Sequence, residues 1–224
     1  MDSELSFTEE NYLKAVYHLS REIGESVSTN AIAESVSTSP ASVNDMIKRL
    51  SSKNLLSHQK YKGAKLLPKG EKIALGIVRK HRLWEVFLVE KLNFKWDEVH
   101  EIAEQLEHIN SPLLISRLDE FLGNPTVDPH GDPIPDENGR IKETVKASVA
   151  EVQLGAKGVV VAVSNDDSAL LKYLDKIGIQ LGAKIMVTDK VEFDGSVAIR
   201  INESSPQFIS KPIAENLLIK LIET

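Results

Sequence analysis

The sequence predicts a mainly α-helical chain with a smaller β-rich part near its carboxyl end. Apolar residues recur at helical spacing through most of residues 7–110, whereas residues 158–201 contain Val-rich runs and an Asp-Gly turn signal. The chain has 224 residues, more than the roughly 150 of a usual domain. We therefore expect several domains, covering residues 1–73, 74–143 and 144–224.

The charge is unevenly distributed along the chain. The net charge is -6, yet residues 44–82 hold eleven Lys or Arg against two acids, and residues 83–151 hold six against fifteen. Such a distribution predicts a basic surface for one partner and an acidic surface for another.

Composition excludes several classes of protein. The absence of cysteine excludes disulfides, thiol nucleophiles and cysteine-based zinc sites, and it favours a reducing, cytoplasmic location. No apolar run approaches the roughly 20 residues that span a bilayer, and the acidic start MDSELSFTEE is unlike a secretory signal. We expect no membrane partner.

Two helices are predicted at the start of the chain. An apolar stripe predicts the first over residues 7–20, beginning near Thr8. A short second helix is predicted over residues 30–35, capped by Ser28 or Thr29.

A third helix and a hairpin follow. Pro40 suits a first helical turn, and the helix is expected to reach about Lys53 with one apolar face made of Val43, Met46, Ile47 and Leu50. Residues 55–61 and 64–67 read as two strands around a glycine turn with lysines at its tip. This order is that of a winged helix-turn-helix.

A winged helix-turn-helix with a basic surface predicts binding to double-stranded DNA. The side chains expected to meet base edges are Ser39, Ala41, Ser42, Asn44 and Asp45. Those expected to meet phosphates are Lys48, Arg49, Lys53, Lys60, Lys62 and Lys65. The alternative is that these lysines only keep a small helical domain soluble.

The acidic block carries metal-ligand spacing. A long helix over residues 71–92 holds His81 and Glu85 four residues apart. A helix predicted over residues 96–110 gathers two imidazoles and two carboxylates on one face, those of His100, Glu104, Glu107 and His108. Imidazole with carboxylate suits divalent transition metals. A solvated helix face that happens to hold histidines is the alternative.

Several stretches together resemble one family. They are NYLKAVY, RKHRLWEVFL, VHEIAEQLEH and DPHGDPIP, with a tail running from LLKYLDKIGIQLGAKI to IAENLLI. The combination resembles the metal-dependent transcriptional repressors typified by the diphtheria toxin repressor and its manganese-sensing relatives. The resemblance implies a helical dimerisation and metal-binding domain and a carboxyl-terminal SH3-like (FeoA-type) β-barrel domain.

The resemblance also implies ligands. It assigns one ion to Glu104, Glu107 and His108 with Asn11 from the first helix. It assigns a second either to Glu85, Asp128 and His130 or to His81, Glu85 and His100. Asp166 and Asp167 are candidates for a further ligand from the carboxyl-terminal domain.

Three positions depart from the family pattern. Asn11 stands where Asp or Met is usual, and Lys14 stands where some manganese sensors keep a carboxylate. Glu104 stands where iron sensors tend to have Cys, which makes the shell all oxygen and nitrogen. This shell favours Mn(II), with Fe(II) next.

The later segments are expected to be a linker and a β domain. Residues 123–141 hold four of the nine prolines, and we expect their first half to carry ligands and the rest to be a tether. A strand over 158–163 and a helix over 169–177 precede two strands, 184–193 and 196–201, which Asp-Gly is expected to join in a type I′ turn.

Together these features predict a homodimeric, metal-activated transcriptional repressor of manganese or iron homeostasis genes that binds a pseudo-palindromic operator. We expect no enzymatic activity and no small organic substrate. Two alternatives stay open. One is a metallohydrolase, although H-E-x-x-H is missing. The other is a winged-helix regulator that senses an organic ligand.

Overall fold

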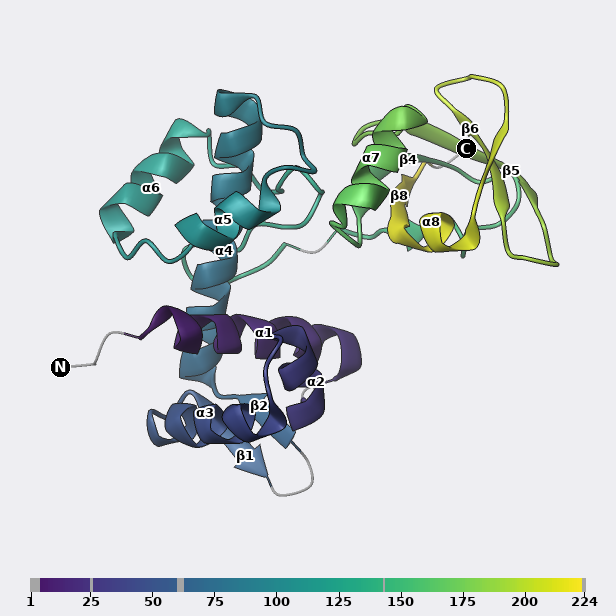
Figure 1. Ribbon diagram of the computed structural model, residues 1–224. Coiled ribbons are helices and arrows are strands. Elements are labelled where there is room, and N and C mark those ends of the chain that lie inside the picture. Colours follow the sequence, from purple (N-terminus) through teal and green to yellow (C-terminus); the bar gives the residue numbers. More distant parts are fainter. Residues whose placement is uncertain (1–4, 25, 60–62, 143, 223–224) are drawn as a thin grey trace. The chain divides into compact units, whose positions relative to one another are not determined.

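The structure is a computed structural model that describes residues 5–24, 26–59, 63–142 and 144–222 (Figure 1). Lys60 and Lys62 of the DNA prediction lie outside the described residues. The chain forms two compact units. The first comprises residues 1–81, 105–115 and 135–141, and the second comprises residues 82–104, 116–134 and 142–224.

The first unit contains a helix-turn-helix followed by a two-stranded hairpin. Its elements are α1 (Phe7–Ile23), α2 (Thr29–Ser35), α3 (Pro40–Ser52), β1 (Leu56–Gln59), β2 (Gly63–Leu66) and the first half of α4 (Pro68–Leu92). The two strands pair antiparallel, with Leu56 opposite Leu66. Figure 1 shows α1, α2 and α3 grouped around this hairpin. The predicted winged helix-turn-helix is therefore the fold of this region.

Side-chain caps set where these helices begin. Ser6 rather than Thr8 caps α1, and its hydroxyl and the carboxylate of Glu9 form a capping box. Ser28 caps α2 and Ser39 caps α3, immediately before Pro40. The predicted first residue of this helix, Phe7, is confirmed, but the predicted cap, Thr8, was wrong by two residues because the pattern of apolar residues does not reveal the cap.

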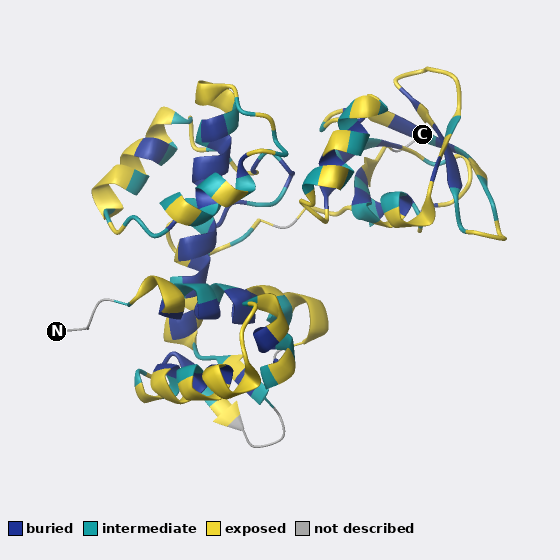
Figure 2. Ribbon diagram, in the orientation of Figure 1, coloured by how far each residue is buried: buried dark blue, intermediate teal, exposed yellow. Residues whose placement is uncertain are grey.

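Apolar faces of all three helices meet in one core, whose largest fully buried side chains are Leu13, Ile32, Ile47, Leu50, Leu55 and Leu56. Figure 2 shows α3 buried on one side and exposed on the other. Gly63 allows the hairpin to approach this core, because a Cβ there would lie 2.2 Å from the carbonyl oxygen of Val27.

The region predicted to carry metal ligands on one helix contains a shorter helix than expected. Helix α5 spans His100–Leu106 and α6 spans Pro112–Phe121. The predicted helix over residues 96–110 was wrong at both ends. Before α5 the chain makes a turn in which the carboxylate of Glu98 accepts a hydrogen bond from the backbone N–H of Lys95, so residues 95–98 do not continue the helix.

The carboxyl-terminal part of the second unit is an antiparallel sheet with two small helices. Its elements are β3 (Ala147–Ser148), β4 (Lys157–Val163), α7 (Ser168–Lys176), β5 (Lys184–Lys190), β6 (Val197–Ile201), β7 (Gln207–Ile209), α8 (Lys211–Asn216) and β8 (Leu217–Leu221). The strand order is β3-β8-β4-β5-β6-β7. Its two end strands are not paired with each other among the described residues, so the predicted barrel is an open, SH3-like sheet.

Two predictions in this region were wrong. The β5–β6 connection is six residues long, since Lys190 pairs with Val197, and only Gly195 of the Asp-Gly pair has a positive φ, +72°. A type I′ turn needs positive φ at both central residues. The second half of the expected linker is not a free tether, because Ile134 and Pro135 are buried.

None of the helices in the described part of the chain combines the length and the hydropathy that crossing a membrane requires.

Candidate metal centre and nucleic-acid interface

Three ionisable side chains are buried together in the second unit. Glu85 comes from α4, and Asp128 and His130 come from the loop that follows α6. One ligand atom from each lies within 4.8 Å of the other two. One imidazole and two carboxylates form a donor set suited to a divalent transition metal.

The ring of His130 is held in one orientation by its second nitrogen. Its Nε2 donates a hydrogen bond of 2.8 Å to the backbone carbonyl oxygen of Trp96. The imidazole ring of His130 also stacks on the indole ring of Trp96, with centroids 6.2 Å apart. The Nδ1 atom then faces Glu85, with 3.8 Å between Nδ1 and Oε2. An outer hydrogen bond of this kind fixes which nitrogen is presented to a metal.

Burial by itself lowers the pKa of His130, but the hydrogen bond and charge of Glu85 outweigh it and raise the pKa to about 9. In the absence of a cation, a proton on His130 therefore balances part of the negative charge here.

Asp128 lacks sufficient positive charge around it. Its Oδ1 accepts hydrogen bonds from the backbone N–H groups of His130 (2.8 Å) and Asp132 (3.0 Å), and its Oδ2 lies 3.4 Å from Nε of Arg82. Burial, followed by the neighbouring charges of Glu85 and Asp132, raises the pKa of Asp128 to about 7. The carboxylates of Asp128 and Asp132 share the guanidinium group of Arg82, an arrangement that a bound cation would relieve.

The loop that carries Asp128 and His130 is fixed to the sheet of the same unit. The carbonyl oxygen of His130 accepts a hydrogen bond of 2.9 Å from the backbone N–H of Val163 on β4. Gly131 has φ +84°, and a Cβ there would lie 1.9 Å from the carbonyl oxygen of Val161. Only glycine fits such a position without strain. The sheet domain thus positions two of the three buried donors.

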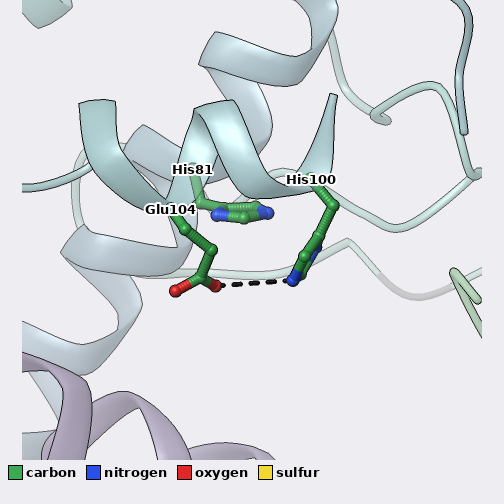
Figure 3. Close-up of side chains that lie close together, drawn as sticks. All are labelled: His81, His100 and Glu104. Atoms are coloured by element: carbon green, nitrogen blue, oxygen red, sulfur yellow. Dashed lines mark ion pairs between the residues drawn. The ribbon is translucent and has the colours of Figure 1, made fainter. Parts of the chain in front are cut away.

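A second group of donors lies around α5. His100 Nε2 is 3.7 Å from Oε1 of Glu104, the ion pair drawn in Figure 3, and His100 Nδ1 is 2.9 Å from Oδ2 of Asp166. His81 of α4 is the third member of this group, with ligand atoms within 4.8 Å of each other. Thus the group contains His81 and His100 of one predicted set, with Glu104 in place of Glu85.

The two candidate ligands of the sheet domain differ in their partners. The hydrogen bond from His100 to Asp166, stronger than the opposing effect of burial, lowers the pKa of Asp166 to about 2. Asp167 instead caps α7 by accepting hydrogen bonds from the backbone N–H groups of Ala169 and Leu170. Of the two, only Asp166 is directed toward a donor group.

Residues Glu107 and His108 have partners within the first unit. The carboxylate of Glu107, which is fully buried, lies 2.6 Å from Nζ of Lys14 through Oε1 and 2.6 Å from Nδ1 of His81 through Oε2. His108 Nδ1 lies 2.6 Å from Oε2 of Glu10.

Asn11 was also predicted as a ligand here, and its Oδ1 is buried without a hydrogen-bond partner. Sequence analysis missed Glu10, although Glu10 and Lys14 are four residues apart on one helix and therefore neighbours.

The residues predicted to read DNA bases are exposed at the start of α3. They are Ser39, Ala41, Ser42, Asn44 and Asp45. Ser39 also caps the helix. The hydroxyl of Thr29 donates to Oδ1 of Asn44 at 3.5 Å, and Asp45 pairs with Lys48 at 3.0 Å. The side chains of Asp45 and Lys48 are 80% and 75% exposed, so this ion pair is weak.

Two residues predicted to contact phosphates form ion pairs with the buried carboxylate of Glu9. Oε1 of Glu9 lies 2.9 Å from Nε of Arg49 and 2.6 Å from Nζ of Lys53. Burial by itself raises the pKa of Glu9, but the hydrogen bonds from Lys53 and from the Ser6 backbone outweigh it, so the pKa is below its usual 4.5. Lys65 is exposed on β2. Sequence analysis missed Glu9, because its partners Arg49 and Lys53 lie far from it along the chain.

Three family profiles match the chain in succession. They are the iron dependent repressor N-terminal DNA binding domain at residues 4–64, the iron dependent repressor metal binding and dimerisation domain at residues 67–136, and the FeoA domain at residues 147–221.

Relatives extend these matches. The iron-dependent repressor IdeR of Mycobacterium tuberculosis is 37% identical over 133 residues, which are 59% of this chain and 57% of that relative. The diphtheria toxin repressor of Corynebacterium glutamicum is 27% identical over 216 residues, which are 92% of this chain and 93% of that relative.

The fold agrees with solved structures. A manganese-dependent transcriptional repressor in complex with manganese has a TM-score of 0.87 and 33% identity, covering 96% of this chain and 100% of that one. ScaR with bound Cd²⁺ has a TM-score of 0.80 and 32% identity, covering 96% and 99%. With its domain profiles in the same order and a whole-length structural relative above 30% identity, the chain belongs to the iron-dependent repressor family of metal-dependent transcriptional repressors.

Proposed function

We propose that this chain is a metal-activated transcriptional repressor that binds a pseudo-palindromic DNA operator as a homodimer and controls manganese or iron homeostasis genes. It acts by binding and not as an enzyme. The proposed domains are a DNA-binding domain at residues 1–73, a dimerisation and metal domain at 74–143 and a FeoA-type domain at 144–224, divisions that the family matches at 4–64, 67–136 and 147–221 support.

The observation that carries the proposal is the buried group of Glu85, Asp128 and His130. Buried carboxylates without sufficient positive charge cost free energy, and a protein retains them where a cation or a reaction requires them. When bound, a divalent ion would supply that missing charge. Glu85 and Asp128 would offer oxygens, and His130 would offer Nδ1 because Nε2 is committed to the Trp96 carbonyl.

We assign Mn(II) as the favoured ion and Fe(II) as the next. The donors in both groups are oxygen and nitrogen, with no cysteine in the chain. Hard ligands of this type suit Mn(II), although ligand type alone selects weakly among divalent metals. The solved relatives include complexes with manganese, Cd²⁺ and Zn²⁺. A direct comparison of metals is therefore part of the experiment below.

DNA recognition is assigned to the exposed start of α3 and to the hairpin. In a helix-turn-helix protein the first residues of the recognition helix meet base edges, and a two-fold dimer sets two such helices one or more helical turns apart. A coupling free energy of about 1–3 kcal/mol between metal and DNA sites would change operator affinity about 5- to 150-fold.

The test is operator binding as a function of metal. Duplexes selected from a random pool by the manganese-loaded chain serve as the operator, and binding is measured after chelation and after separate addition of Mn(II), Fe(II), Zn(II) and Co(II) without oxygen. We expect Mn(II) to raise the affinity at least about 5-fold. Equal affinity with and without every metal would overturn the proposal.

The outcomes also separate the alternatives. Metal-dependent turnover of an ester, peptide or phosphoester would indicate a metallohydrolase. Operator binding that ignores metals, in a chain that calorimetry shows to bind none, would indicate a regulator that senses an organic ligand.

A further inference from the structure

The donor group around Glu107 already contains positively charged side chains. Two carboxylates, those of Glu10 and Glu107, lie among two ammonium groups. Lys14 binds Glu107 directly, and Lys80 interacts electrostatically with both carboxylates. The side chain of Lys14 is 12% exposed and that of Glu107 is fully buried, so the pair is weakly screened by water.

The carboxylate oxygens of Glu107 are also engaged. Each has a partner at 2.6 Å, Lys14 on one side and His81 on the other. Nδ1 of His108 has Glu10 at 2.6 Å, and its Nε2 lies 3.8 Å from Oε1 of Glu107, the oxygen that Lys14 contacts. An ion that entered would have to displace the ammonium group and face the half-buried Lys80 as well.

The buried group of the second unit presents the opposite situation. There Asp128 and Asp132 share Arg82 at 3.4 Å, and Nδ1 of His130 lies 3.8 Å from Oε2 of Glu85, so the ionic contacts are longer than those of Glu107. A divalent cation would replace these longer contacts, whereas around Glu107 it would have to displace an ammonium group held at 2.6 Å.

We propose that the ammonium group of Lys14 takes the place of a metal ion at the Glu107–His108 site, so that this site holds α1 in position permanently and does not sense metal. The inference rests on the proposed function only in treating the chain as a metal sensor. It departs from the ligand set that the resemblance implied, which placed an ion on Glu107 and His108.

The replacement has a structural consequence for α1. Lys14 to Glu107 and Glu10 to His108 are two links, one helical turn apart on α1, and both form without an added ion. The amide oxygen of Asn11 lies on the same helix and is buried without a donor. We expect this oxygen to become a ligand only when the ammonium group is removed and a carboxylate is added.

The experiment is the stoichiometry of Mn(II) binding to the whole chain, measured by calorimetry and by the electron paramagnetic resonance signal of free Mn(II). The decisive variant is Lys14→Glu, which replaces the ammonium group with a carboxylate. Lys157→Glu makes the same charge change on an exposed residue of β4 and is the matched control. Lys14→Met removes the charge while keeping a long side chain, and it is used if Lys14→Glu does not fold.

We expect Lys14→Glu to bind one more Mn(II) per protomer than the wild type and Lys157→Glu to bind the same number as the wild type. With Lys14→Met we expect an additional, weaker ion. A folded Lys14 variant with unchanged stoichiometry would overturn the inference. So would a wild-type ion that is lost in Glu107→Gln but retained in Asp128→Asn.

Failure of the proposed function is read from a different quantity. The inference depends on the difference between variant and wild type, whereas the proposed function depends on whether the wild type binds Mn(II) at all and binds DNA more tightly with it. A wild type that binds no ion and a Lys14→Glu variant that binds one would refute the proposed function and support the inference.

Discussion

Glu9 connects α1 to the recognition helix α3, and replacing it with glutamine should loosen that connection. Its Oε2 accepts a hydrogen bond of 2.9 Å from the backbone N–H of Ser6, and its Oε1 receives Arg49 and Lys53. Glutamine has the same shape but turns one oxygen into an NH₂ group. In either orientation that NH₂ group faces a donor, so at least one of these interactions is lost.

The expected cost follows from the exposure of the partners. Removing one member of a fully buried ion pair costs about 3–5 kcal/mol, because the other charge stays buried. Here the side chains of Arg49 and Lys53 are 57% and 25% exposed and can turn toward water. Losing the charged hydrogen bonds and half of the capping box should therefore cost about 2–3 kcal/mol.

The assay is hydrogen exchange of the α1 and α3 amides followed by mass spectrometry. It is chosen because the two tryptophans, Trp84 and Trp96, lie in the other unit and would not report on this one. Glu22→Gln removes an exposed carboxylate from the same helix and is the matched control. We expect lower protection in Glu9→Gln and no change in Glu22→Gln.

The difference in amide protection between the wild type and Glu9→Gln should also depend on pH. The pKa of Glu9 in the folded chain is below its usual value of 4.5, so its stabilisation is fully present above about pH 4.5 and is lost as the pH falls through the folded value. The difference in amide protection between the wild type and Glu9→Gln should be constant from about pH 5 to 8, and it should become smaller in stronger acid. Equal protection at neutral pH, or a gap that acid does not narrow, would refute the reasoning.

Three further predictions concern the buried donor group of Glu85, Asp128 and His130 and the DNA-reading helix α3. Asp128→Asn keeps the acceptor for two backbone N–H groups but removes a charge, so Mn(II) affinity in calorimetry should fall at least about 10- to 100-fold; an unchanged isotherm would contradict the assignment. Gly131→Ala should lower the melting temperature by more than Gly178→Ala, because both have positive φ, +84° and +78°, but only the former meets a β4 carbonyl; equal shifts would show that the clash is relieved. Asn44→Ala should relax the preference at one base pair, by about 1–3 kcal/mol, whereas Lys48→Ala should weaken binding to all duplexes alike. The measurement is a competition assay with mutated operators. The same pattern of losses for both variants would contradict the distinction between base and phosphate contacts.

The sequence predicted the winged helix-turn-helix because its determinants are local. The apolar stripe of α3, the proline in its first turn and the glycine of the hairpin all act within a few residues of each other. The exact beginning of α1 depended on the Ser6 and Glu9 cap, which no apolar periodicity encodes. Helix α5 was predicted too long for a similar reason, since the turn held by Glu98 interrupts an otherwise helical pattern.

The residue types of the metal donors were also evident from the sequence, because histidine and carboxylate spaced three or four apart share a helix face. How those donors are grouped was not. Glu85 joins Asp128 and His130 only because β4 fixes the loop at Gly131, which lies 39 residues after the end of α4 along the chain. Likewise Asp166 and Asp167 are equivalent in the sequence, and the N-terminal cap of α7 distinguishes them.

The sequence by itself therefore determined the kind of protein: the order of helices and strands, the DNA-reading helix and a supply of metal donors, all of which depend on short-range periodicity. Only the tertiary structure decided which charges neutralise each other. Lys14 meets Glu107, Glu9 meets Arg49 and Lys53, and Asp128 meets too little positive charge. Coulomb energy depends on distance in space and on burial, and neither can be read from separation along the chain.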